Sequence, residues 1–211
     1  ISKTQELVTA LGRRFFAVKA DLSKMESVNK VFDAVMEHYG RIDILFNNAG
    51  AIRREDCTVF SEKDWDDVMN LNIKTLFFLT QRVGAQMIEK KIPGKVVNTA
   101  SLLAFQGGIR TPSYTASKSA VKGLTMTLAN EWAKYGINVN VVCPLAMTES
   151  LAQWKEDYPE IYEKTLQGVP MRRFADPEGD VGRVCVFLAS EDASFITGET
   201  ISVQGGGSLR P

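Results

Sequence analysis

Three side chains in the middle of this sequence have the types and spacing needed to move a proton on an alcohol oxygen. Ser101 is followed by Tyr114 and Lys118, which lie four residues apart. A tyrosine and a lysine with that spacing share one face of a helix, where an ammonium group lowers the pKa of the phenol and prepares it to give or take a proton. A serine hydroxyl at a strand end can hold a substrate oxygen against that phenol. The same Tyr-x-x-x-Lys spacing also occurs on ordinary amphipathic helices, so the pair needs support from the rest of the chain.

Length and charge limit the class of protein. The chain has 211 residues, the size of one α/β domain, which we place at 1–211. Its 25 basic and 25 acidic residues cancel, so we expect a small-molecule substrate and neither a nucleic-acid nor a membrane partner. No stretch of the sequence approaches the roughly 18 apolar residues of a membrane span.

The cysteines and the histidine indicate no metal chemistry. Cys57, Cys143 and Cys185 are far apart and form no CxxC pair, so we expect no metal site. Free thiols indicate a reducing compartment, and the first residues have no signal-peptide layout, so we expect the cytoplasm. No candidate catalytic partner lies at a characteristic spacing from His38, which is therefore interpreted as a surface residue.

Short apolar runs alternate with segments of helical period along the whole chain. Strands are predicted at 15–18, 42–46, 95–98, 137–142 and 200–203, and helices at 2–11, 25–39, 61–90, 114–135, 149–167 and 176–188. A turn and helix N-cap are expected at 21–23, and Ser61 with Asp64 predicts a capped helix start. The alternation predicts an α/β fold with a Rossmann-like, doubly wound parallel sheet.

The polar residues of interest gather at one end of the predicted strands. Asn47, Ser101 and Pro144 each fall where a strand ends. Sheets of this kind bind ligands outside the carboxyl ends of their strands. One edge of the sheet is therefore the expected functional edge.

Five motifs, in order, resemble those of the short-chain dehydrogenase/reductase family. They are Asn-Asn-Ala-Gly at 47–50, Asn72, Ser101, Tyr114-x-x-x-Lys118, and Asn-Val-Asn at 138–140 leading to Pro144. The match covers essentially all 211 residues. The resemblance implies an NAD(P)-dependent oxidoreductase that interconverts a secondary alcohol and a ketone, and it implies a homotetramer.

The resemblance also implies roles for individual residues. Tyr114 would be the general acid/base, Lys118 would lower its pKa and bind the nicotinamide ribose, and Ser101 would hold the substrate oxygen. Asn72 would anchor a water linking Lys118 to solvent. The residues implied to contact NAD or NADP are Asp21, Leu22, Asn48, Ala49, Gly50, Tyr114, Lys118, Pro144 and Thr148.

The chain departs from the family pattern at its start. The family opens with a strand, a Thr-Gly-x-x-x-Gly-x-Gly loop that approaches the cofactor pyrophosphate, a helix and a second strand. The 211 residues contain no such loop, so the expected sheet lacks the first two strands and the domain is N-terminally incomplete. We expect the natural polypeptide to be longer. The alternative is a shortened chain of the same fold, a non-catalytic or cofactor-deficient binding or structural protein. The missing strand would carry the residue that selects NAD or NADP.

Two further departures lie near the other strand ends. Leu145 stands where many members have glycine, which bears on the cofactor contacts of Pro144 and Thr148. Gln204 stands where aspartate is usual, and we expect it to bear on a subunit contact.

Within the family, the chain resembles sugar-acid dehydrogenases that act on deoxygluconates and their keto forms. The residues implied to bind substrate, with Ser101 and Tyr114, are Arg53, Leu103, Gln106 and Arg110. Arg53, Arg54 and Arg110 are expected on loops at the functional edge. A guanidinium group suits a substrate carboxylate, and Gln106 suits a sugar hydroxyl. Solvated loop arginines are an equal alternative for each arginine. Another carbonyl substrate, such as a 3-oxoacyl group, remains open.

Overall fold

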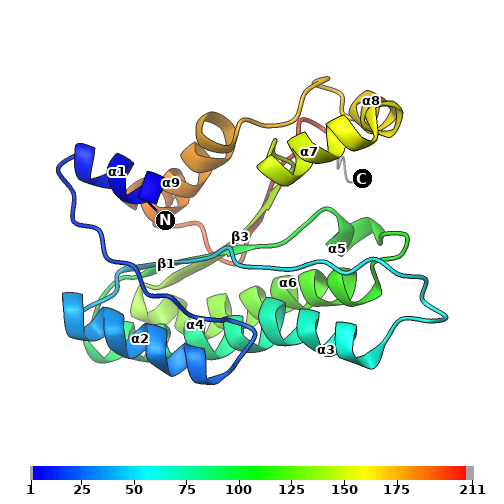
Figure 1. Cartoon of the computed structure of the whole chain (residues 1–211). Helices are drawn as coiled ribbons and strands as arrows, with labels where there is room; N and C mark the ends of the chain where they lie inside the picture. Colours follow the sequence, from blue (N-terminus) through cyan, green and yellow to red (C-terminus); the bar gives the residue numbers. More distant parts are fainter. Residues whose placement is uncertain (1, 208–211) are drawn as a thin grey trace.

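The centre of the computed structural model, which describes residues 2–207, is a four-stranded parallel sheet (Figure 1). Its strands, in spatial order, are β1 (Ile44–Asn47), β2 (Lys95–Thr99), β3 (Asn138–Pro144) and β4 (Thr200–Val203). Every neighbouring pair is parallel. The predicted α/β fold with a parallel sheet is confirmed, and these four strands match predicted ones to within two residues at each end.

Helices surround and connect the strands. They are α1 (Ser2–Ala10), α2 (Glu26–Tyr39), α3 (Glu62–Met69), the π-helix η1 (Asn70–Thr75), α4 (Leu76–Glu89), α5 (Leu103–Gln106), α6 (Pro112–Trp132), the 3-10 helix η2 (Ala133–Tyr135), α7 (Glu149–Asp157), α8 (Pro159–Gln167), the π-helix η3 (Pro177–Gly182), α9 (Arg183–Ala189) and the 3-10 helix η4 (Glu191–Ala193).

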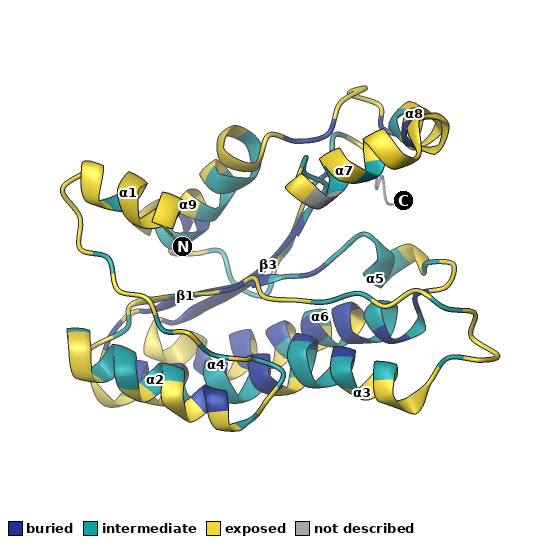
Figure 2. Cartoon of the chain, in the orientation of Figure 1, coloured by how far each residue is buried: buried dark blue, intermediate teal, exposed yellow. Residues whose placement is uncertain are grey.

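Helices lie on both faces of the sheet, and the central strands β2 and β3 are buried on both. Figure 1 shows α2, α4 and α6 below the sheet and α9 above it, and Figure 2 shows the buried faces of α4 and α6 turned toward the strands. Met87 and Trp132 pack against β2 and β3 in the lower core, whereas Val97 and Leu188 lie in the core under α9. Strands buried on both faces explain the continuous valine-rich runs in the sequence.

The strand predicted at 15–18 is wrong. The segment has no strand structure, and Phe16 instead stacks on His38 with 4.2 Å between ring centroids. His38 is exposed, as predicted, but it holds this segment against the end of α2. A parallel strand needs a neighbour for its N–H and C=O groups. An apolar run without a partner strand therefore stays out of the sheet.

The outer strand β1 also lacks a neighbouring strand on one side within the described residues. Among residues 2–207, no strand pairs with β1 on the side away from β2. Ile44 and Phe46 on that strand are each 45% exposed. A strand that lacks a neighbour on one side leaves apolar surface of this kind uncovered.

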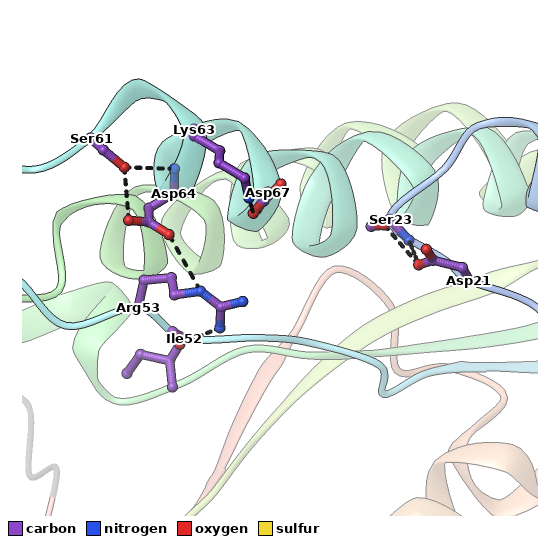
Figure 3. Close-up of polar contacts among 8 residues, drawn as sticks. All are labelled: Asp21, Ser23, Ile52, Arg53, Ser61, Lys63, Asp64 and Asp67. Carbon is purple, nitrogen blue, oxygen red and sulfur yellow. Dashed lines mark hydrogen bonds and ion pairs between the residues drawn. The ribbon is translucent and has the colours of Figure 1, made fainter.

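Several helix boundaries refine the predictions. Ser61 caps α3 as predicted, since its hydroxyl accepts a hydrogen bond from the Asp64 N–H at 3.1 Å. The N-cap predicted at 21–23 is wrong: α2 begins after Met25, and Asp21 closes a turn by accepting bonds from the N–H and hydroxyl of Ser23 (Figure 3).

The predicted helix 176–188 is divided into η3 and α9, and two other predicted helices are also interrupted. The segment 149–167 forms α7 and α8, which meet at Tyr158, because the residue before Pro159 is disfavoured in the helical region. The segment 61–90 forms α3, η1 and α4, and the π-helical turn of η1 contains Asn72. A π-helical turn inside a helix frequently marks a functional site.

Helix packing beneath the sheet gives a first testable prediction. A methyl group at Gly84 of α4 would overlap the ring of Trp132 on α6. We expect Gly84→Ala to lower the free energy of unfolding by about 1–3 kcal/mol through overpacking. Gly123→Ala is the matched control, because it is an exposed helical glycine with nothing within 4 Å of the added carbon. It should raise stability by about 0.5–1 kcal/mol. Urea unfolding measures both, and equal effects would contradict this packing.

Candidate active site

A buried ammonium group lies at the centre of the functional edge. Lys118, on α6, is 4% exposed, and its Nζ donates a hydrogen bond to the Thr99 carbonyl at 2.7 Å. Thr99 is the last residue of β2, so the lysine is fixed to a strand end. Burial lowers the pKa of Lys118 from 10.5 to about 8. A lysine at this pKa can exchange protons near physiological pH.

A buried amide ties the neighbouring loop to the same helix. Asn72, fully buried in η1, accepts a hydrogen bond from the Ala51 N–H at 2.9 Å and donates to the Ala51 carbonyl at 2.9 Å. Its Nδ2 also donates to the Ser117 hydroxyl at 3.0 Å. The loop after β1, the π-helical turn and α6 are thereby held together. The resemblance gave Asn72 a water-anchoring role, and the structure adds a second one, positioning the loop.

Gly50 lets these groups approach one another. An added Cβ on Gly50 would lie 3.3 Å from the Asn72 Oδ1 and 3.4 Å from the Lys118 Nζ. The glycine backbone therefore lies directly against both groups. The absence of a side chain leaves a cradle beside the ammonium group, which suits the close approach of a ligand backbone or ring.

The phenol and the serine hydroxyl meet at the start of α6. Tyr114 lies in the first turn of α6, and its ring centroid is 5.8 Å from the Lys118 Nζ. Burial raises the pKa of Tyr114, while a hydrogen bond with the Ser101 side chain and the positive charge of Arg54 lower it. The net shift is upward, so the expected lowering of this pKa is not found in the structure. The physical reason is that the phenol loses more hydration than these two groups replace.

Two of the residues predicted to bind substrate are engaged in ion pairs. Arg53 pairs with Asp64 at 3.5 Å between Nε and Oδ1 (Figure 3). Arg110 pairs with Glu55 at 3.0 Å and with Asp56 at 3.2 Å. Both arginines lie on loops at the functional edge, but neither guanidinium group is free of a protein carboxylate.

The other two substrate candidates lie on the short helix α5. Leu103 begins α5 and is half-buried, and its backbone N–H donates to the Ser101 hydroxyl at 3.3 Å. Gln106 ends α5 and is exposed. This single turn brings both residues to the same side of the sheet as Ser101.

Several of the residues implied to contact NAD or NADP lie around β1. Leu22, Asn48 and Ala49 line a cavity of about 70 Å³ whose other walls include Phe46 and Leu76. The Asn48 Oδ1 accepts a bond from the Thr99 hydroxyl at 3.3 Å. Asp21 lies in a separate, wide hollow of about 630 Å³, and its hydrogen bonds to Ser23 lower its pKa.

The residues predicted near the nicotinamide follow β3. Pro144 ends β3, and the next residue bonds through its N–H to the Val203 carbonyl of β4 at 3.0 Å. The Thr148 hydroxyl caps α7 by accepting from the Leu151 N–H at 3.2 Å. The Thr148 hydroxyl accepts in this bond and uses only a lone pair, so its hydrogen can still be donated to a ligand.

The chemistry of this edge fits a nicotinamide cofactor. The cradle at Gly50 lies beside a buried ammonium group, and Lys118 would hold the ribose, with Thr148 at the carboxamide. When bound, NAD or NADP supplies the hydride chemistry that no side chain here can supply.

Sequence reasoning missed two supporting groups. They are the Thr99 carbonyl that holds Lys118 and the Ser117 hydroxyl that holds Asn72. Ser117 had a usable signal, since it lies one residue before Lys118 on the same helical turn as Tyr114. The contact between Lys118 and the Thr99 carbonyl depends on where β2 ends relative to α6, and no sequence pattern predicts that position.

Asn47 and Gln204 have structural partners. Asn47 is buried, and its Nδ2 donates to Thr80 and to Asn98, each at 2.8 Å. Gln204 donates to the Cys143 carbonyl at 3.0 Å. Asn47 therefore joins β1 to β2 and α4, which fixes the height at which the loop at 48–50 leaves the sheet.

Comparisons with known proteins show which family the chain belongs to. A family model described as enoyl-(acyl carrier protein) reductase matches residues 2–208. The chain is 49% identical over 205 residues to the 2-dehydro-3-deoxy-D-gluconate 5-dehydrogenase of Escherichia coli K12, covering 97% of this chain and 81% of that protein. It is 40% identical over 212 residues to the 12alpha-hydroxysteroid dehydrogenase of a Clostridium species, covering 98% and 81%.

Solved structures give the same result. A protein from Agrobacterium tumefaciens, assigned as a 2-deoxy-D-gluconate 3-dehydrogenase and holding NADP, matches with a TM-score of 0.90 and 41% identity, over 99% of this chain and 82% of that one. An NAD+-bound xylitol dehydrogenase matches with a TM-score of 0.88 and 30% identity, over 97% and 84%.

This chain belongs to the short-chain dehydrogenase/reductase family, and its sheet and helices follow the Rossmann-like fold of that family. It is an NAD(P)-dependent oxidoreductase, as the sequence predicted. The prediction of NAD or NADP as the cofactor is also confirmed.

The described residues contain neither a membrane-spanning helix nor a cluster of metal ligands. No helix between residues 2 and 207 is long and apolar enough to cross a membrane. Over the same residues, no group of three or more His, Cys, Asp or Glu side chains could hold a metal ion.

The buried lysine predicts an unusual dependence of stability on pH. Between pH 8 and 10.5 the unfolded chain keeps the Lys118 proton that the native protein has lost, so stability rises with pH through this window. Below pH 8 the buried charge costs up to about 3 kcal/mol. We expect Lys118→Met to be more stable than the wild type at pH 7, with a difference that narrows toward pH 10.5. Lys164→Met, on the exposed surface of α8, is the control, and a pH-independent difference between Lys118→Met and the wild type would refute the buried charge.

The cradle at Gly50 predicts a second effect. In Gly50→Ala, the added carbon must displace the Lys118 Nζ or the Asn72 Oδ1 by a few tenths of an ångström. We expect kcat to fall about tenfold or more, since small misplacements of reacting groups are costly. Steady-state kinetics with thermal unfolding tests this: lost stability with unchanged kcat would contradict the role of Gly50.

Proposed function

We propose that this enzyme interconverts a secondary alcohol and a ketone on a sugar acid, such as a keto-deoxygluconate, with Tyr114 as the acid/base. The observation that carries the proposal is the joint position of Ser101, Tyr114 and Lys118, with Asn72 behind them, at the functional edge. Together these residues can hold a carbonyl oxygen, protonate it and replace the proton.

In the direction of reduction, the substrate carbonyl oxygen accepts a hydrogen bond from Ser101. The raised pKa of Tyr114 keeps its phenol protonated at neutral pH, so it can give that proton to the oxygen as the carbonyl carbon is reduced. Lys118, with a pKa of about 8 and its Nζ 5.8 Å from the Tyr114 ring centroid, replaces that proton through a bridging hydroxyl or water. In the direction of oxidation the same proton moves back from the alcohol to the tyrosine.

The sugar-acid substrate is supported by two observations. Relatives at 49%, 48% and 42% identity bear the name 2-dehydro-3-deoxy-D-gluconate 5-dehydrogenase. Three arginines, Arg53, Arg54 and Arg110, lie on loops at the functional edge, where a substrate carboxylate would be attracted. A 3-oxoacyl substrate, favoured by relatives at 34% identity, is the alternative that a substrate screen must exclude.

The remaining predictions follow the family. A homotetramer, a cytoplasmic location and a single domain over 1–211 stay predictions. A non-catalytic protein of this fold has no support from the site, because all four catalytic side chains are present.

Replacement of Tyr114 tests the proposed chemistry. We expect Tyr114→Phe to reduce turnover of 2-dehydro-3-deoxy-D-gluconate at least about a hundredfold, because general acid/base catalysis contributes that much. Affinity for NADH and NADPH, measured by fluorescence titration, should change little. Tyr135→Phe, on the 3-10 helix after α6, is the control. A Tyr114→Phe enzyme with near wild-type turnover would refute the role of Tyr114 as acid/base. If the wild type turns over 3-oxoacyl substrates and no sugar acid, the proposed substrate class is wrong.

A further inference from the structure

The π-helical turn η1 joins two α-helices and differs from both in its hydrogen bonds. In an α-helix each N–H bonds to the carbonyl four residues earlier, whereas in a π-helix it bonds to the carbonyl five residues earlier. Where such a turn returns to the α-helical pattern, the backbone N–H groups pass over one carbonyl. A buried carbonyl without a donor is costly, so a turn of this kind needs a donor from a side chain.

The hydroxyl of Thr75 is that donor. Its Oγ1 lies 3.1 Å from the Leu71 carbonyl oxygen and 3.1 Å from the Asn70 carbonyl oxygen, and Thr75 is buried, with an exposure of 3%. The N–H of Leu76, the first residue of α4, bonds to the Ile73 carbonyl and serves neither of these two. The Thr75 hydroxyl therefore supplies a donor where the start of α4 does not.

Other helical threonines show that this contact belongs to the wide turn. Thr127 of α6 and Thr165 of α8 each donate through the hydroxyl to the carbonyl four residues earlier. Thr75 makes that bond and also reaches the carbonyl one residue further back. The segment 70–75 contains neither proline nor glycine, which are common causes of an irregular helix. Its π-helical form is therefore maintained by side-chain contacts such as this one.

The position of Asn72, inside η1, depends on the form of this turn. Its side-chain amide holds the Ala51 backbone at two points and donates to the Ser117 hydroxyl. Successive residues of a helix point about 100° apart, so closing the turn to an α-helix would rotate Asn72 away from these partners. Gly50, next to Ala51, lies against the Lys118 Nζ, so the same rotation would loosen the backbone beside the ammonium group.

We infer that Thr75 is a positioning residue for the reaction, and that its hydroxyl holds η1 in the π-helical form that directs Asn72 at its partners. The inference rests on the proposed function and adds to it a residue outside the reacting set. A purely structural role would leave kcat unchanged in a folded variant. A positioning role predicts a loss of turnover that is transmitted through Asn72.

A matched pair of variants isolates the hydroxyl. Thr75→Ala and Thr75→Ser both lose the methyl group, but only Thr75→Ser keeps the donor. In the full chain we expect Thr75→Ala to lower kcat for 2-dehydro-3-deoxy-D-gluconate about tenfold, and Thr75→Ser to stay within about twofold of the wild type. Thr127→Ala removes an exposed hydroxyl from α6 and is the control, with an unchanged kcat. If Thr75→Ala does not fold, Thr75→Val provides the same comparison, because it keeps the shape of the side chain without the donor.

A double-mutant cycle shows whether the effect passes through Asn72. Residues that act through one another have non-additive effects, whereas independent residues have effects that multiply in kcat. We therefore expect Thr75→Ala to lower kcat by less than about twofold when it is added to Asn72→Ala. A further tenfold loss in the double variant would contradict the inference.

Hydrogen exchange gives a result that does not depend on turnover. The Ala51 N–H is held by the Asn72 Oδ1, so mass spectrometry of Thr75→Ala should show exchange of this loop about tenfold faster than in the wild type. Exchange in β2 should keep its wild-type rate, and Thr75→Ser should restore the loop. Equal acceleration in the loop and in β2 would mean a general loss of stability and would contradict a positioning role.

The failures of the two proposals are distinguishable. If the wild type turns over no sugar acid with NADH or NADPH, the proposed function is wrong, and hydrogen exchange alone decides whether Thr75 positions the loop. If Asn72→Ala keeps the wild-type kcat, the assigned site is wrong and the inference fails with it. If Asn72→Ala loses turnover but Thr75→Ala keeps the wild-type kcat and loop exchange, only the inference about Thr75 is wrong.

Discussion

The site depends on one constraint, the burial of the Lys118 ammonium group between the ends of β1 and β2. Its hydrogen bond to the Thr99 carbonyl fixes it at the end of β2, and the Gly50 backbone lies against it from the loop after β1. Burying this charge lowers its pKa to about 8 and disfavours the native state at neutral pH. The enzyme accepts lower stability in return for a proton donor that responds near physiological pH, which is the usual compromise at active sites.

The surrounding structure serves to keep that geometry. Asn72 ties the loop at Ala51 to α6 through Ser117, and α6 is the helix that carries the phenol and the lysine. Deeper in the sheet, Asn47 and Asn98 bond one another across β1 and β2, and Asn98 donates on to Thr125 of α6. Asn47 uses both of its amide hydrogens in buried contacts, and such networks specify the register of neighbouring elements. The heights of the strand ends, and with them the positions of Ser101 and Gly50, follow from that register.

The sequence predicted what depends on local pattern and missed what depends on partners. The four strands of the sheet, the Ser61 cap and the position of Tyr114 and Lys118 on one helix follow from periodicity and capping. The strand predicted at 15–18 failed because an apolar run does not say whether a neighbouring strand exists. The arginine contacts were invisible for the same reason: Arg110 and Glu55 are 55 residues apart in the chain. The upward shift in the pKa of Tyr114 could not be foreseen either, since burial and a neighbouring charge oppose one another and only the folded geometry decides between them. The break at Tyr158 is different, because Pro159 was a usable signal for it.

The most direct test of this account is the pKa of Lys118 itself. Nitrogen-15 NMR of the lysine Nζ atoms, followed from pH 6 upward and assigned by the signal missing in Lys118→Met, reports the protonation of that one group. The account predicts a titration midpoint of about 8 for the cofactor-free protein. A midpoint at 10.5, the ordinary lysine value, would mean that the ammonium group is hydrated rather than buried. The central constraint of the site would then be wrong.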